Sequence, residues 1–187
     1  MSTLTSLPNL LTLMRIVLIP IFIGVFYLPF SSAHALAAII FALASFTDWL
    51  DGYLARKLKQ MSPFGAFLDP VADKLLVATS LLLLVGEKEI SFLTLPAIVI
   101  VGREIVISAL REWMAEVGKR ASVTVSYIGK VKTTVQMMAL VLLLAFQPAQ
   151  SYWGVLGFIL LYVAAILTIW SMVIYIMIAW PQLLKKA

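Results

Sequence analysis

Six long apolar runs dominate this sequence and limit what it can fold into. Hydrophobic residues make up 63% of the chain and charged residues 12%, whereas about 25% of a soluble domain is charged. A helix that crosses a membrane needs roughly 20 apolar residues, so little chain remains for a separate soluble domain. We therefore predict an all-α integral membrane protein with six transmembrane helices in one domain, residues 1–187. The runs are 10–30, 33–51, 63–85, 90–110, 127–146 and 152–180.

The basic residues lie in alternate connections between these runs. The opposite set of connections contains only Lys88. Because cytoplasmic loops of membrane proteins carry an excess of Lys and Arg, this asymmetry predicts that both termini lie in the cytoplasm. The basic residues on the predicted cytoplasmic side are Arg56, Lys57, Lys59, Arg111, Lys119, Arg120, Lys130, Lys132, Lys185 and Lys186.

Charge and cysteine content exclude several classes of partner and site. The chain has no cysteine, so it can form neither disulfides nor thiolate metal sites. Its net charge of +5 points to membrane topology and anionic lipid, because basic residues beside membrane helices serve those roles. We expect membrane lipids as partners and no nucleic acid.

Four aspartates lie in or beside the second and third apolar runs. Asp48 and Asp51 are three residues apart, a spacing that puts both on one helix face. Asp69 and Asp73 are four residues apart and also share a face. A carboxylate at the membrane centre costs about 2.5–3.5 kcal/mol, so such residues are functional candidates. The two helices form a hairpin, which allows the two acidic faces to meet.

Carboxylates gathered in one place repel one another. Two anions about 5 Å apart cost roughly 3 kcal/mol at an effective dielectric of about 20, so protonation or a bound cation must offset the repulsion. Oxygen ligands without His or Cys suit Mg²⁺ or Mn²⁺, and two-metal sites are typical of phosphoryl transfer. The pattern predicts a site for two such ions. For single residues a structural role stays open, with Asp69 as a helix cap and Asp73 as a member of an ion pair.

The four acids belong to a longer motif. It runs Asp48-x-x-Asp51-Gly52-x-x-Ala55-Arg56, then eight residues, then Gly65-x-x-x-Asp69-x-x-x-Asp73. This motif resembles the signature of the CDP-alcohol phosphatidyltransferase family at every fixed position. Three further segments resemble the bacterial branch of that family that uses glycerol 3-phosphate as acceptor, and nearly the whole chain is similar to it. These segments are Pro8-Asn9-Leu10-Leu11-Thr12-x-x-Arg15, Arg103-Glu104 with Leu110-Arg111-Glu112, and Gly129-Lys130-Val131-Lys132-Thr133.

The resemblance implies a reaction and a location. Glycerol 3-phosphate attacks the lipid-bearing phosphorus of CDP-diacylglycerol, CMP leaves, and phosphatidylglycerol phosphate stays in the membrane. This is the first step of phosphatidylglycerol synthesis. The resemblance further implies a multi-pass homodimer in the bacterial cytoplasmic (inner) membrane, with its active site facing the cytoplasm.

The resemblance also implies roles for individual residues. Asp48, Asp51 and Asp69 correspond to the principal metal ligands. Asp73 corresponds to the general base that accepts the proton of the acceptor hydroxyl, and it is also expected to contact metal. The residues expected to bind the nucleotide and CDP-diacylglycerol are Gly52, Ala55, Arg56, Gly65, Asn9, Thr12 and Arg15. For Arg15, a long side chain reaching to the membrane interface remains an alternative.

The phosphate of the acceptor requires a basic pocket near the cytoplasmic ends of the fourth and fifth runs. Arg103 is the sharpest candidate, because it lies inside an apolar helix with Glu104 as a possible partner. Lys130 and Lys132 could instead set topology or bind anionic lipid. The expected phosphate-binding residues are Arg103, Arg111, Lys130 and Lys132.

Two other functions fit parts of the sequence. The same chemistry could use another acceptor, such as inositol phosphate, serine or a second phosphatidylglycerol, because the metal motif does not select the acceptor. A small ion-coupled transporter could use the acids as a relay. Transporters typically show internal repeats and paired broken helices, and neither is evident here.

Overall fold

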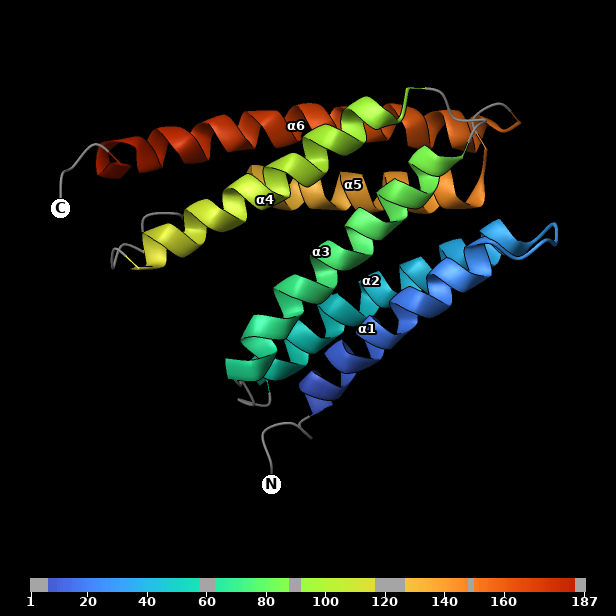
Figure 1. Ribbon diagram of the computed structural model, residues 1–187, viewed down its shortest axis with the longest axis horizontal. Coiled ribbons are helices and arrows are strands. Elements are labelled where there is room, and N and C mark those ends of the chain that lie inside the picture. The colour runs from blue at the N-terminus through green and yellow to red at the C-terminus, as the bar shows by residue number, and fades with distance from the viewer. Residues whose placement is uncertain (1–6, 58–62, 88–91, 117–126, 148–149, 184–187) are drawn as a thin grey trace.

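The computed structural model describes residues 7–57, 63–87, 92–116, 127–147 and 150–183 (Figure 1). Within these ranges the chain forms helices and no strand, which confirms the all-α prediction. Each helix coincides with one apolar run of the sequence. The helices are α1 (Leu7–Phe26), α2 (Ala33–Lys57), α3 (Pro63–Gly86), α4 (Thr94–Glu116), α5 (Tyr127–Ala145) and α6 (Tyr152–Leu183).

Several helix boundaries differ from the apolar runs: α2 and α4 extend six residues further, to Lys57 and Glu116, and two boundaries fall inside the runs. The first run extends to residue 30, but α1 ends at Phe26 and a turn follows. Pro29 accounts for this end, because a proline disfavours helical geometry in the residue before it. The fourth run begins at residue 90, but α4 begins at Thr94. Just before it, Phe92 has a φ of 68°, a value that does not fit a right-handed helix.

Within the described ranges, two helical stretches are long and apolar enough to cross a membrane by length and composition, namely Asn9–Phe26 and Tyr152–Trp180. Shorter apolar stretches lie in α2 and α5, at Ala33–Asp48 and Val131–Ala145. Polar and charged residues interrupt the apolar pattern of α3 and α4, and Asp73 of α3 is one example. The structure thus has an apolar helical character, while the crossing of a membrane by all the helices remains a prediction.

The helices associate as two antiparallel pairs joined through the middle of the molecule. In Figure 1, α1 lies along α2 and α5 lies along α6. The third helix packs on α1, α4 packs on α6, and α2 contacts α5 across the two pairs. Because successive helices alternate in direction, the starts of α1, α3 and α5 and the ends of α2, α4 and α6 point to the same side, toward the left and lower left of Figure 1.

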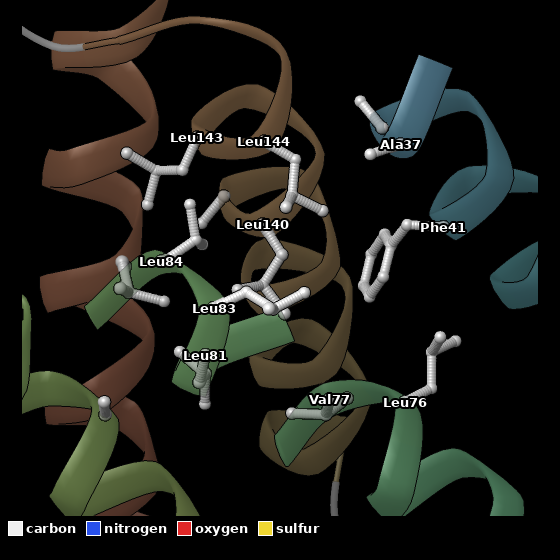
Figure 2. Packing of buried hydrophobic residues seen from close by; sticks show 14 of the residues in the cluster. Ala37, Phe41, Leu76, Val77, Leu81, Leu83, Leu84, Leu140, Leu143 and Leu144 are labelled. Carbon is white, nitrogen blue, oxygen red and sulfur yellow. The ribbon is translucent and has the colours of Figure 1, made fainter. Parts of the chain in front are cut away.

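The core draws buried apolar side chains from every described helix, and Figure 2 shows its part around α2, α3 and α5. Figure 2 shows Leu81 and Leu84 of α3 on the side of Leu140 and Leu143 of α5, and Leu76 of α3 on the side of Ala37 and Phe41 of α2. These side chains are almost completely buried. Apolar side chains also cover the outside of the bundle, so close packing, more than removal from water, selects which faces meet in a membrane helix bundle.

Several residues of the sequence analysis lie beyond what the structure describes. Of the basic residues used to predict topology, the structure describes the side chains of Lys57, Arg111 and Lys132. Residues outside the described ranges are Lys59, Lys88, Lys119, Arg120, Lys185 and Lys186. Gly52, Ala55, Arg56 and Lys130 belong to α2 and α5, but their surroundings also lie outside the description.

Candidate active site

Arg15 joins the two aspartates of α2. Its Nη1 lies 2.5 Å from Asp48 Oδ1 and its Nη2 lies 2.5 Å from Asp51 Oδ2. The Arg15 side chain is completely buried, Asp51 is 2% exposed and Asp48 is 41% exposed. One guanidinium can reach both carboxylates because their spacing puts them on the same face of α2. The fork of an arginine is well suited to this role.

Thr12, one turn before Arg15, brings an acid of α3 to the same place. Its hydroxyl donates a hydrogen bond to Asp69 Oδ1 at 2.6 Å, and Asp51 Oδ2 lies 3.4 Å from the same oxygen. Thr12 is buried. A hydroxyl has one proton to donate, so the shorter contact to Asp69 is the stronger bond. The acidic faces of α2 and α3 therefore meet against α1, as the hairpin predicts.

Asp73 lies one turn beyond Asp69 on α3 and is half-buried. Among the described residues it makes no hydrogen bond or ion pair. Four charged groups act on its charge, namely Asp48 and Arg15 of the acidic group at α1, and Glu104 and Lys132 of a second charged group on α4 and α5.

The second charged group centres on Glu104 of α4. Its Oε1 accepts hydrogen bonds from Arg103 Nη1 at 2.7 Å and from Lys132 Nζ of α5 at 3.0 Å. Arg103 Nη2 also donates to Ser171 Oγ of α6 at 3.3 Å. Arg103 is 7% exposed and Lys132 is 1% exposed. We call Arg103, Glu104 and Lys132 the basic cluster, because two cations here share one carboxylate and leave an excess of positive charge suited to an anion.

The remaining predicted residues are placed as follows. Arg111 is exposed, lies over the ring of Tyr175 at 5.3 Å from the ring centroid, and donates to its hydroxyl at 3.4 Å. The charge of Arg111 acts on Lys132. The hydrogen bonds to Glu104, however, come from Arg103 and Lys132. Asn9 is buried on α1 and Gly65 is buried near the start of α3.

Three further contacts involve residues that the sequence analysis did not single out. Lys74 of α3 donates a hydrogen bond to Ser108 of α4, and Ser108 donates to the backbone oxygen of Glu104 at 2.6 Å. The four-residue spacing of Glu104 and Ser108 could have indicated that they share a face. Nothing in the sequence pointed to the contact of Ser171 with Arg103, because it depends on how α4 and α6 pack.

The acidic group has the donor chemistry of a hard divalent cation site. Asp48, Asp51 and Asp69 supply oxygen ligands of the kind that Mg²⁺ and Mn²⁺ prefer. In the described ranges, no three acidic or histidine side chains are close enough together to bind one ion as they stand. The positive charge between Asp48 and Asp51 comes from Arg15, whose buried Nε has no hydrogen-bond partner among the described atoms. The residues fit the ion by the chemistry of their oxygen donors, while Arg15 occupies the place between Asp48 and Asp51.

Comparison with known proteins places this arrangement in a family. The pattern that defines the CDP-alcohol phosphatidyltransferase family matches residues 5–170. A relative from Pseudomonas fluorescens named CDP-diacylglycerol--glycerol-3-phosphate 3-phosphatidyltransferase is 56% identical over 179 residues, which cover 95% of this chain and 92% of the relative. Relatives of the same name from Yersinia enterocolitica and Pectobacterium atrosepticum are 55% and 56% identical over 180 residues, covering 96% of this chain and 98% of each relative. The chain therefore belongs to the membrane-bound CDP-alcohol phosphatidyltransferase family.

Proposed function

We propose that this protein transfers the phosphatidyl group of CDP-diacylglycerol to sn-glycerol 3-phosphate, giving phosphatidylglycerophosphate and CMP. The names and the near-complete coverage of its bacterial relatives support this activity. The observation that carries the proposal is that Arg15 and Thr12 gather three aspartates against α1, while two buried cations share Glu104 on α4 and α5. An acidic group suited to cations and a cluster with an excess of positive charge can together receive two anionic substrates.

Asp73 is the proposed general base. It accepts the proton of the glycerol 3-phosphate hydroxyl, the hydroxyl oxygen forms a bond to the lipid-bearing phosphorus, and the bond from that phosphorus to CMP breaks. A base must be within hydrogen-bond reach of the proton that it takes. The absence of a hydrogen bond or ion pair to Asp73 among the described residues supports this role, because its oxygens are not committed to another group.

Members of this family generally use divalent metal ions. We assign Asp48, Asp51, Asp69 and Asp73 as the residues that would hold two ions, Mg²⁺ or Mn²⁺. Bound ions of this kind neutralise charge on phosphoryl oxygens and on a phosphate leaving group. Thr12 and Arg15 support this assignment, since they gather three of these carboxylates against α1.

The nucleotide portion of CDP-diacylglycerol is assigned to the α1–α2 side of the site. Asn9, Thr12 and Arg15 line the start of α1, and Gly65 lies at the start of α3. Gly52, Ala55 and Arg56 complete this group on the basis of the family motif. Small residues let a ligand approach the backbone closely, which is the physical reason for glycine and alanine at such positions.

The phosphate of the acceptor is assigned to the basic cluster. Arg103 and Lys132 are buried cations that share Glu104, and Arg111 and Lys130 are the further cations assigned to this pocket. A phosphate dianion suits an arginine fork and an ammonium group together. Its binding here would bring the acceptor hydroxyl toward Asp73.

The proposed activity also implies a membrane location and an orientation for the protein. We infer a multi-pass protein of the bacterial cytoplasmic (inner) membrane, with six transmembrane helices, cytoplasmic termini and an active site that faces the cytoplasm. Most of the assigned residues lie in the half of each helix that ends at the basic side chains, with Arg103 near the middle of α4, which supports that orientation. We also infer a homodimer, as the family resemblance implies.

A single assay tests the function. Purified protein in detergent receives CDP-diacylglycerol, Mg²⁺ and one labelled acceptor, and CMP release is measured. We expect release that depends on glycerol 3-phosphate and disappears with a chelator. Release with inositol phosphate or serine instead would identify another acceptor, and no CMP release with any acceptor would contradict the transferase assignment.

A further inference from the structure

Gln136 of α5 is a buried polar residue that the proposed reaction does not yet use. Its side chain is 4% exposed, and its amide oxygen Oε1 has no hydrogen-bond partner among the described residues. A buried acceptor without a partner is unfavourable, and most such atoms in proteins are paired. The amide of Gln136 is therefore a candidate for contact with a bound molecule.

Its position on α5 places Gln136 beside the basic cluster. Gln136 follows Lys132 by four residues, so the two residues share a helix face and lie about 6 Å apart along the helix axis. Lys132 donates a hydrogen bond to Glu104 of α4, and its charge acts on Asp73 of α3. The face of α5 that carries Gln136 is thus the face that contributes Lys132 to the proposed acceptor site.

One turn beyond Gln136, the same face of α5 enters the apolar core. Leu140 is completely buried, and Figure 2 shows it among the leucines of α3 and α5. The helix α3 changes in the same way, since Asp73 is followed one turn later by Val77, a buried member of the core. Gln136 therefore lies at the boundary between the charged site and the core.

The unpaired amide oxygen restricts which group can bind beside it. A phosphate dianion has no proton to donate, so it suits Arg103 and Lys132 but not the oxygen of Gln136. A hydroxyl suits the whole amide, because it can donate to the oxygen and accept from the nitrogen. Glycerol 3-phosphate has two hydroxyls. The terminal one is the less hindered nucleophile, which leaves the middle hydroxyl, on C2, for recognition.

We propose that Gln136 binds the C2 hydroxyl of the acceptor and thereby selects glycerol 3-phosphate. The inference rests on the proposed function, which assigns the acceptor phosphate to Arg103 and Lys132. The C2 hydroxyl lies between the phosphate and the reacting hydroxyl, as Gln136 lies next to the phosphate-binding cations and on the face of Lys132. An acceptor that lacks this hydroxyl leaves the buried amide unpaired, and a polar site rejects such an analogue for that reason.

A comparison of two acceptors tests the proposal. The analogue 3-hydroxypropyl phosphate keeps the phosphate and the terminal hydroxyl of glycerol 3-phosphate but lacks the C2 hydroxyl. We expect the wild type to prefer glycerol 3-phosphate in kcat/KM by about tenfold or more, the effect of leaving a buried acceptor unpaired. Gln136→Met keeps most of the side-chain length and removes the amide, so the preference should disappear. Equal kcat/KM values for the two acceptors in the wild type would overturn the proposal.

Thr168→Val is the matched control. Thr168 of α6 is also buried, and its Oγ1 likewise has no hydrogen-bond partner among the described residues. Valine has a similar shape without the hydroxyl, and we expect this variant to keep the wild-type preference. If Gln136→Met lowered kcat/KM for both acceptors by the same factor, Gln136 would have a structural role only. Loss of the preference in Thr168→Val would likewise reject a specific role for Gln136.

Thermal unfolding gives a readout that does not depend on turnover, because a ligand of the folded protein raises its unfolding temperature. The protein is heated in detergent with Mg²⁺, CMP and one of the two acceptors. In the wild type, glycerol 3-phosphate should raise the unfolding temperature more than 3-hydroxypropyl phosphate does, whereas the two should act equally on Gln136→Met. Equal shifts in the wild type, or none, would overturn the proposal. A difference in shift without any CMP release would support the C2 contact and contradict the transferase function alone.

Discussion

Arg15 of α1 and Asp51 of α2 form an ion pair of 2.5 Å with both side chains at most 2% exposed. Asp48 shares the same guanidinium, so one cation holds two carboxylates at the place where α1 and α2 meet. Removing one partner of a buried ion pair leaves an uncompensated charge. The pair therefore links the stability of the α1–α2 contact to the acidic group of the site.

Arg15→Leu is expected to destabilise the protein by about 3 kcal/mol or more, because it leaves Asp51 buried without its cation. Thermal unfolding in detergent measures the loss. Added Mg²⁺ should recover more stability in this variant than in the wild type, since a divalent cation neutralises the same carboxylates. His34→Ala is the control, because His34 and Glu87 are 3.9 Å apart and partly exposed. Equal losses in the two variants would contradict the structural role of Arg15.

Asp73→Asn is expected to reduce turnover by about a hundredfold or more, the usual contribution of a general base. The folded protein should persist, because Asp73 makes no hydrogen bond or ion pair among the described residues. CMP release and thermal unfolding are measured together, with Glu112→Gln on the exposed side of α4 as the control. Turnover near the wild-type value would remove Asp73 from the role of base.

Arg103→Ala is expected to raise the KM for glycerol 3-phosphate about tenfold or more, as for the loss of a hydrogen bond between charged groups. The KM for CDP-diacylglycerol should change much less. Lys57→Ala removes an exposed cation of α2 and should leave the acceptor KM unchanged. If Arg103→Ala raised both KM values equally, Arg103 would not be specific for the acceptor phosphate.

Glu104→Gln is expected to lower thermal stability, since Arg103 and Lys132 then face each other without the carboxylate that they share. A second substitution, Lys132→Met, should restore part of the loss by removing one of the two like charges. The double-mutant comparison isolates this interaction from general damage. Additive losses in the double variant would show that Glu104 does not act as the counterion of the cluster.

Gly157→Ala is expected to destabilise the contact between α5 and α6. A Cβ at this position would lie 2.9 Å from Leu142 Cβ and 3.2 Å from the backbone oxygen of Ala139, so the helices must move apart. Such overpacking costs about 1–3 kcal/mol. Gly24→Ala is the control, because nothing lies within 4 Å of its added Cβ. Thermal unfolding should separate the two, and equal melting temperatures would refute the close approach.

The helices were predictable because apolar runs of sufficient length are a local property of the chain. Their ends were less predictable, as α1 shows by ending at Phe26, where the effect of Pro29 outweighs the continuing apolar pattern. The pairing of acids on each helix also followed from spacing alone. The sequence did not predict that Arg15 is the partner of Asp48 and Asp51. Arg15 is far from them in sequence, and its side chain on α1 could point in several directions.

The order of apolar and charged residues by itself determined that the chain is helical, that Asp48 and Asp51 share a face, and that the motif matches one family. These features depend on residues within a few turns of one another. Only the tertiary structure decided that Thr12 meets Asp69, that Glu104 joins Arg103 to Lys132, and that Gln136 is buried with no partner for its amide oxygen among the described residues. Such contacts depend on how helices distant in sequence pack, and packing reflects the shapes of many side chains at once.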